Sequence, residues 1–260
     1  MVRKIVELNK VNLLFDLDIY RRDSLRDLFI DYVSSPIQAI RRSPNQLHVL
    51  KDISLSISEG ERIGVLGING SGKTTLCRIL TGMYKPESGK IVSSGFIRGI
   101  FDTEVGIQPE LTGRENAKLL CSLLFPELKD VDTIVEEALE FSELGTFVDT
   151  PYRNYSKGMQ ARLCLSLVSN QPADLVILDE VFDGADKYFG NKVSKRFIEL
   201  MQQSGAVLFV SHDPGQVLEI CNRVIVMEHG EIIFDGNNKE GVSFYEEKVK
   251  GMESGEAYSS

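Results

Sequence analysis

The sequence predicts an α/β fold whose central sheet is mainly parallel. Three apolar runs have the length and composition of buried strands: "ERIGVL" at 61–66, "DLVILD" at 174–179 and "AVLFVS" at 206–211. Patterns with helical periodicity separate these runs along the chain. Strands that alternate with helices are typical of a parallel sheet, because each helix returns the chain to the end of the sheet where the next strand begins.

The first 60 residues predict two strands around an insert. "KIVELNKVNLLF" at 4–15 reads as an edge strand, and the alternation in "ISLSISEGER" predicts a strand that runs into a turn. Between them, a helical insert is expected at about 21–45, and its apolar face either packs on the core or serves a separate role. The residues of that face are Leu25, Leu28, Phe29, Tyr32 and Val33.

The rest of the chain predicts an inserted helical subdomain and an antiparallel edge. Residues 108–170 read as mostly helical, for example in "VDTIVEEALEFSELG". "RVIVMEHGEIIFDG" at 223–236 reads as a β-hairpin. We therefore expect one domain over 1–240, followed at 241–260 by a short C-terminal helix and a polar tail.

Composition narrows the possible functions. The chain has 260 residues, 42% hydrophobic and 26% charged, as expected of a globular protein. Its formal net charge of −9 argues against nucleic acid as the main ligand. No apolar run reaches the roughly 18 residues of a membrane span, and the N-terminus lacks a signal peptide. The four cysteines have apolar neighbours and no C-x-x-C spacing, so we expect reduced core residues in a cytoplasmic protein.

The glycine-rich turn after the first buried strand predicts a phosphate-binding loop. Gly67 to Thr74 fits the pattern G-x-x-x-x-G-K-[ST], whose glycines let backbone N–H groups approach a phosphate chain. Lys73 is expected to reach the β and γ phosphates, and the Thr74 hydroxyl to bind Mg²⁺. The alternative is a glycine-rich turn with a chance match. The predicted ATP ligands here are Gly67, Asn69, Gly70, Ser71, Gly72, Lys73, Thr74 and Thr75.

Two further strands end in polar residues that suit a P-loop NTPase core. Asp179 and Glu180 follow four apolar residues, at the strand end where ligands bind in parallel sheets. Asp179 would hold Mg²⁺ and Glu180 would act as general base toward the attacking water. His212 ends the next strand and is expected to contact the γ phosphate. A solvated turn and a structural histidine are the alternatives.

The stretch "NYSKGMQARL" has two interpretations. Ser156 and Gly158 stand at the start of an apolar-periodic helix, where unpaired N–H groups favour anions. The serine could equally be an ordinary helix N-cap. The residues alone do not decide between an anion site and a cap.

The order of these motifs resembles the ATPase subunit of ABC transporters. That order is a phosphate loop, a helical segment, an S-x-G-M signature, a strand ending in Asp-Glu, and a histidine. "YSKGMQARL", "QPELTGREN" and "DEVFDGADKYF" are similar to stretches in the branch that exports bacterial polysaccharides such as O-antigen, capsule and teichoic acid. The resemblance covers about 6–236 and implies that 1–240 is an ABC-type ATPase domain.

The resemblance implies a head-to-tail homodimer that binds ATP and Mg²⁺. One subunit would offer its phosphate loop, while Ser156 and Gly158 of the partner would close over the γ phosphate. The family's D-loop aspartate falls on Asp186. Asp102 stands where most relatives have a glutamine, and it is a further Mg²⁺ candidate. Tyr20 is the expected adenine-stacking residue, with Phe15 and His48 as competitors.

The function implied is an ATPase subunit that powers export of a lipid-linked polysaccharide. A pair of separate permease subunits would supply the membrane path, which would place this chain on the cytoplasmic face of the bacterial inner membrane. The chain is expected to lack the C-terminal carbohydrate-binding domain of some relatives. The alternatives are an ABC ATPase for another cargo, such as a lipid or drug, and a soluble ABC ATPase outside transport.

Overall fold

The fold is described from a computed structural model of the chain. It describes residues 2–16, 46–100, 106–125, 130–169, 173–179, 195, 199 and 203–253. The helical insert expected at about 21–45 lies outside these residues, as does the end of the polar tail, 254–260.

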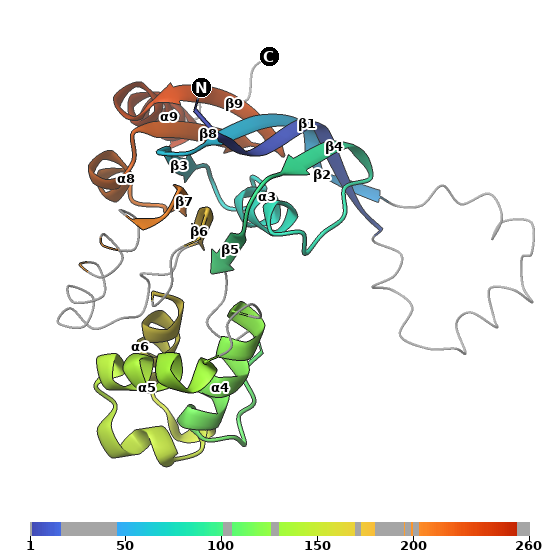
Figure 1. Cartoon of the computed structure of the whole chain (residues 1–260). Coiled ribbons are helices and arrows are strands. Elements are labelled where there is room, and N and C mark those ends of the chain that lie inside the picture. Colours follow the sequence, from blue (N-terminus) through green and yellow to red (C-terminus); the bar gives the residue numbers. More distant parts are fainter. Residues whose placement is uncertain are drawn as a thin grey trace, which may run out of the picture.

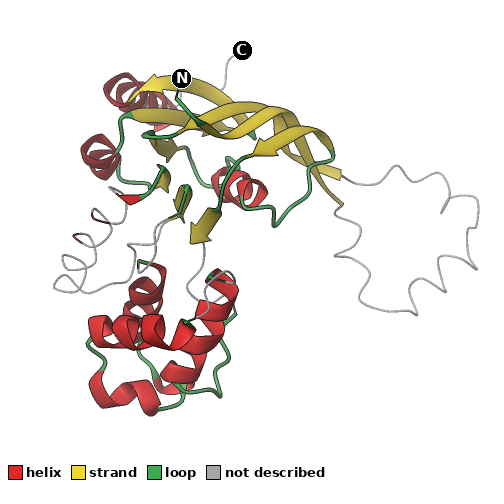
Figure 2. Ribbon diagram, in the orientation of Figure 1, coloured by secondary structure: helices red, strands yellow, loops and turns green. Residues whose placement is uncertain are grey.

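A six-stranded sheet forms the centre of the molecule (Figures 1 and 2). Its strand order is β5-β6-β7-β3-β8-β9, and every neighbouring pair is parallel except the β8–β9 hairpin. This arrangement confirms the predicted fold class, a mainly parallel sheet with an antiparallel edge. The strands are β3 (Arg62–Leu66), β5 (Ile97–Ile100), β6 (Leu175–Asp179), β7 (Ala206–Val210), β8 (Arg223–Glu228) and β9 (Glu231–Asn237).

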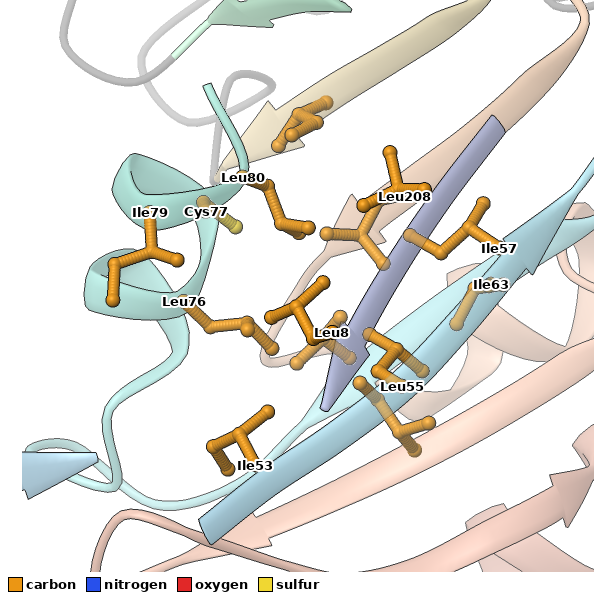
Figure 3. Packing of buried hydrophobic residues seen from close by; sticks show 14 of the residues in the cluster. Leu8, Ile53, Leu55, Ile57, Ile63, Leu76, Cys77, Ile79, Leu80 and Leu208 are labelled. Atoms are coloured by element: carbon orange, nitrogen blue, oxygen red, sulfur yellow. The ribbon is translucent and has the colours of Figure 1, made fainter. Parts of the chain in front are cut away.

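A second, three-stranded antiparallel sheet covers one face of the first. Its order is β2-β1-β4, formed by β1 (Lys4–Asp16), β2 (Gln46–Ser58) and β4 (Ser88–Ser93). The strands expected at 4–15 and around Ile53 are therefore present. Apolar residues of both sheets form one buried cluster with helix α3 (Lys73–Leu80), which Figure 3 shows from close by. Leu76, Ile79 and Leu80 of α3 lie in this cluster and hold the helix against the sheets.

The chain leaves the central sheet after β5 and returns at β6, and between them it forms a helical subdomain. The subdomain contains α4 (Gly113–Leu124), α5 (Val131–Ser142) and α6 (Lys157–Val168), with short 3₁₀ turns at Gly145–Asp149 and Tyr152–Asn154. Figure 1 shows these helices gathered on one side of the sheets. They share a buried cluster of their own, the subdomain cluster, which includes Leu120, Val135 and Leu163.

Helix α6 joins the subdomain to the central sheet. Its residues Leu163 and Leu167 belong to the subdomain cluster. Ala161, Cys164 and Leu165 belong instead to a second cluster, the sheet cluster, which packs on β6, β7 and β8. One helix therefore contributes to two cores, because apolar residues lie on more than one of its faces.

A buried arginine makes a second connection between the two parts. Arg98 on β5 is 3% exposed, and its guanidinium lies 4.2 Å from the ring centroid of Phe125, the residue that ends α4. The Phe96 ring lies 5.1 Å from the same group. A cation held over an aromatic ring is attracted by the negative electrostatic potential of the ring face, so Arg98 links the core strand to the subdomain.

The C-terminal part of the described chain packs against the hairpin edge. Helices α8 (Pro214–Ile220) and α9 (Asn238–Glu253) follow β7 and β9. Helix α9 begins at Asn238, before the boundary expected at residue 241, and ends at Glu253. Among the described residues, no helix is both long and apolar enough to cross a membrane. The four cysteines are buried, as predicted for core residues.

Candidate functional site

The glycine-rich loop lies between the end of β3 at Leu66 and the start of α3 at Lys73. Gly67 is confined by its neighbours: a Cβ there would lie 2.4 Å from the carbonyl oxygen of Met227 and 2.6 Å from Ser71 Oγ. Gly72 occupies the N-cap of α3 in the left-handed conformation and has no side chain to cap the first turn. The local backbone therefore needs glycine, and it leaves the helix start open to an anion.

The polar groups of the loop converge on its inner side. Lys73 is 7% exposed, and its Nζ donates to the carbonyl oxygens of Gly67 (2.8 Å) and Ile68 (3.2 Å). Ser71 Oγ is buried and has no hydrogen-bond partner among the described residues. A buried hydroxyl in this position suits a ligand with oxygen acceptors. An ammonium, a helix N-terminus and a buried hydroxyl together fit a phosphate chain.

The carboxylate at the end of β6 lies close to this loop. Asp179 is 5% exposed and pairs with Val210 of β7 in the sheet register. Burial raises the pKa of the Cys77 thiol in α3, the negative charge of Asp179 raises it further, and the positive charge of Lys73 lowers it. Both charges are thus near the same thiol. Thr74 adds a hydroxyl on the first turn of α3, so oxygen donors of the kind that Mg²⁺ prefers lie on adjoining elements.

The expected γ-phosphate contact comes from the loop after β7. His212 is exposed, and it follows Ser211 at the same edge of the sheet as Asp179. The amide of Asp213 donates to Ser211 Oγ at 3.1 Å. Asp213 in turn caps α8, accepting from the amide of Gly215 at 2.8 Å. These bonds hold the loop that carries the histidine.

Ser156 acts as a helix cap within its own chain. It is the N-cap of α6, and its Oγ accepts from the amide of Met159 at 3.2 Å. Gly158 has an open neighbourhood, since a Cβ there would meet only Ser156 Oγ, at 3.9 Å. Nothing described in the chain itself requires a glycine at this position. Ser156 lies in the helical subdomain and Lys73 in the core, so they stand on separate parts of the molecule (Figure 1).

Four predicted site residues lie outside the described residues. The assignment of the adenine-stacking residue therefore stays a prediction. They are Tyr20, Asp102, Glu180 and Asp186. Of the two competitors of Tyr20, Phe15 packs edge-on against Tyr84, with ring centroids 5.4 Å apart. His48 is exposed on β2, and its Nε2 lies 2.9 Å from Asn12 Oδ1.

Sequence reasoning missed the residues that hold the loop from behind. The amide of Gly230, in the turn between β8 and β9, donates to the carbonyl of Ser71 at 3.0 Å. The carbonyl of Gly230 accepts from Lys51 on β2 at 2.8 Å. Leu50 packs under Gly72, where a Cβ would lie 3.1 Å from Leu50 Cδ2. "HG" in a hairpin is a turn signal, but nothing in it points to a contact about 160 residues earlier in the chain.

A Gly67→Ala variant tests the geometry of the loop. The new Cβ would overlap the Met227 carbonyl, so the loop must shift; overpacking of this kind typically costs about 1–3 kcal/mol. We expect lower stability in chemical denaturation and nucleotide affinity reduced at least about tenfold in a titration with a fluorescent analogue, a loss equal to about 1.4 kcal/mol. Gly82→Ala is the control, because Gly82 also has a positive φ of 76° but no atom within 4 Å of its Cβ position. Full affinity in Gly67→Ala would contradict the assignment.

The fold and the loop together define a class: a P-loop nucleotide-binding protein with a helical subdomain inserted in a mainly parallel sheet. Comparisons with known proteins specify it further. A model of the family described as "ABC transporter" matches residues 50–183. The chain therefore belongs to the ABC transporter family, in which it is an ATP-binding subunit that hydrolyses ATP.

Three curated relatives show the range of similarity. The chain is 36% identical to the ABC transporter protein AbcA of Aeromonas salmonicida, over 81% of this chain and 70% of that protein. It is 35% identical to an O-antigen export system ATP-binding protein, RfbB, of Klebsiella pneumoniae, over 84% and 89%. It is 35% identical to the teichoic acids export ATP-binding protein TagH of Enterococcus faecalis, over 85% of this chain and 49% of that protein. The chain thus spans about half the length of the last relative.

Solved structures share the fold. The dimeric, post-hydrolysis state of the ATP-binding cassette MJ0796, bound to ADP and Pi, superposes with a TM-score of 0.68 at 21% identity, over 90% of this chain and 99% of that one. The cbiO1 protein of Clostridium perfringens, part of the ABC transporter complex cbiONQ, gives 0.62 at 23% identity, over 95% and 93%. These likenesses confirm an α/β ATPase fold with a helical subdomain.

Proposed function

We propose that this chain powers the export of a lipid-linked polysaccharide, of the O-antigen or teichoic acid type, through a membrane permease. The observation that carries the proposal is the 35% identity to an O-antigen export ATP-binding protein over nearly the whole of that protein. The similarity to teichoic acid exporters supports it. The subunit would work as a homodimer on the cytoplasmic face of the bacterial inner membrane, beneath a pair of permease subunits.

ATP would bind along the loop before α3. The backbone groups and the buried hydroxyl that would surround the phosphates come from Gly67, Asn69, Gly70, Ser71 and Gly72. Lys73 would move from the carbonyl oxygens of its own loop to the β and γ phosphates, exchanging two neutral acceptors for charged ones. Thr75, on the first turn of α3, would add its amide to the phosphate contacts.

The residues around the loop would divide the chemistry between them. Thr74 and Asp179 are the proposed Mg²⁺ ligands, with Asp102 as a further candidate. A bound Mg²⁺ supplies Lewis acidity that stabilises charge on the transferred phosphoryl group. Glu180 would orient and deprotonate the attacking water, and His212 would contact the γ phosphate.

The partner subunit would complete the site. We infer that Ser156 and Gly158 of one chain face the γ phosphate bound to the other, with Asp186 at the interface and Tyr20 stacked on adenine. The open space at Gly158 supports this inference, because its own chain does not account for the glycine. The start of α6 also offers N–H groups to an anion. Closure of two such surfaces would exclude water and link hydrolysis to movement of the permease.

A Lys73→Ala variant in cells tests the cargo. A polymer longer than the membrane is thick needs many ATP cycles, so cells with only this variant should lose surface polysaccharide and accumulate lipid-linked polymer inside. Surface sugar is measured by labelled lectin, and the lipid-linked pool by extraction. Lys90→Ala, an exposed lysine on β4, is the control and should export normally. Normal surface polysaccharide, with lost export of a small lipid or drug, would favour another cargo.

A further inference from the structure

The turn before α6 is built on a loop from the other end of the subdomain. The amide of Tyr152 donates to the carbonyl of Leu111 at 2.8 Å, and the amide of Arg153 to that of Pro109 at 3.0 Å. Thr112 forms an antiparallel bridge with Pro151. The segments 109–113 and 150–153 are thus paired backbone to backbone.

Tyr155 completes this pairing through its side chain. Its phenol is buried against Gly113, where a Cβ would lie 2.0 Å from Tyr155 Oη and 2.9 Å from Cζ. The hydroxyl donates to the carbonyl of Phe147 at 2.8 Å. Burial raises the pKa of the phenol, and the charge of Asp149 raises it further, so at neutral pH the group keeps the proton that it donates. Because Gly113 has no side chain, the Tyr155 ring has room to lie against the backbone there.

The loop that receives the ring is itself fixed. Asn116 is fully buried; its side-chain amide donates to the carbonyls of Gln108 (2.9 Å) and Leu111 (3.2 Å), and its oxygen accepts from the amide of Gln108 (2.8 Å). Thr112 and Glu115 form a reciprocal capping box at the start of α4. The stretch "QPELTGREN" therefore acts within its own subdomain, as the rigid support of the turn that carries Tyr155.

We propose that Tyr155, seated on Gly113, is the positioning residue of the signature serine. The inference rests on the proposed function, in which Ser156 faces the partner's γ phosphate. Because Ser156 follows directly in the chain, any shift of the Tyr155 backbone moves the serine and the start of α6. The loop 108–113 thus serves the ATP site of the other subunit without touching nucleotide.

Gly113→Ala is the direct test, because its Cβ would occupy the place of the Tyr155 hydroxyl. A displacement of about 1 Å can cost on the order of 10²-fold in rate, so we expect kcat for ATP to fall at least about tenfold. Nucleotide affinity of the chain's own loop, measured with a fluorescent analogue, should stay within about twofold, because Lys73 belongs to the core. Such a split between kcat and affinity would not follow from general unfolding.

Tyr155→Phe is a second test of the positioning role. It removes the atom at 2.0 Å and the bond to Phe147, so we expect a moderate loss of kcat, about threefold to tenfold, from freer placement of the ring. The double variant Gly113→Ala with Tyr155→Phe should resemble Tyr155→Phe more than Gly113→Ala, because the worst overlap is gone. If Gly113→Ala does not fold, judged by circular dichroism, Tyr155→Phe decides the question by its own kcat.

Val135→Ala is the matched control: it opens a cavity in α5, in the same buried cluster, and leaves both Gly113 and the Tyr155 side chain unchanged. It should lower the melting temperature and leave kcat within about twofold of wild type. The positioning role would be overturned if folded Gly113→Ala had a kcat within about twofold of wild type. If Gly113→Ala does not fold, the same result in Tyr155→Phe would overturn it. A loss of kcat in Val135→Ala equal to that in Gly113→Ala would overturn it as well. If Ser156→Arg keeps full turnover, the partner-site role itself fails; if it is inactive while the Tyr155 and Gly113 variants are normal, only the positioning role fails.

Discussion

Replacing Glu180 with glutamine is expected to lower the rate of ATP hydrolysis by about 10² to 10⁴ while leaving ATP binding intact. The amide keeps the size of the side chain but cannot accept the proton of the attacking water. Glu180 directly follows Asp179 in the sequence, and Asp179 ends β6 next to α3, at the edge where parallel sheets bind ligands. Turnover at saturating ATP and Mg²⁺ is the measurement, with nucleotide affinity measured in parallel.

Glu137→Gln provides the matched control for this change. Glu137 is an exposed residue of α5 in the helical subdomain, so the same loss of one negative charge there should leave turnover unchanged. Activity of the Glu180→Gln protein within about twofold of wild type would show that another group activates the water. The site would then keep its phosphate loop but need a new general base.

Replacing Ser156 with arginine should reduce turnover by about 10² to 10³, the loss typical for removal of a positioned donor in an active site. The bulky side chain would also stand between the two subunits. ATP should therefore no longer hold the Glu180→Gln protein as a dimer once Ser156→Arg is added. Without bound nucleotide the two chains, each with a net charge of −9, repel one another.

Sedimentation at protein concentrations well above micromolar checks the assembly, and steady-state hydrolysis checks the rate. Ser122→Arg is the control, because Ser122 is exposed on α4 of the same subdomain, and among the described residues its hydroxyl bonds within its own helix, to the carbonyl of Lys118. Unchanged turnover in Ser156→Arg would remove the signature from the ATP site. A Glu180→Gln protein that stays monomeric in saturating ATP and Mg²⁺ would count against the head-to-tail dimer.

The parts of the site that the sequence predicts are those whose chemistry is local. The phosphate loop is a run of eight residues between a strand and a helix, and both neighbours carry clear periodicity. The structure has β3 before the loop and α3 from Lys73, as expected. The position of Asp179 at the end of a strand was predictable for a related reason. The apolar residues before it define a buried strand, and ligands bind at the carboxyl ends of such strands.

Contacts between distant segments could not be predicted in this way. The bond from Gly230 to Ser71 and the packing of Leu50 under Gly72 depend on how the second sheet sits on the first. Gly113 reads as part of a polar helix start, and only the fold reveals that Tyr155 fills the space of its missing side chain. Composition and periodicity describe faces of elements, but they do not say which faces meet.

Ser156 shows where physical reasoning from sequence leaves two answers. A serine at a helix start predicts a cap and an anion site equally well. In the structure its Oγ accepts from the amide of Met159, so the cap is present. A hydroxyl that accepts one bond can still donate another, and the proposed contact with the partner's phosphate uses that proton.

The double membership of α6 determines how the molecule unfolds. Three of its residues, Ala161, Cys164 and Leu165, are part of the core beneath the central sheet, while Leu163 and Leu167 close the core of the subdomain. If the helical subdomain unfolded first, the central sheet would lose the apolar contacts that α6 makes with it. If the sheet unfolded first, α6 would lose one of the two cores into which it packs. We therefore expect the two parts to unfold in one cooperative transition, with the helical segment and the sheet melting together.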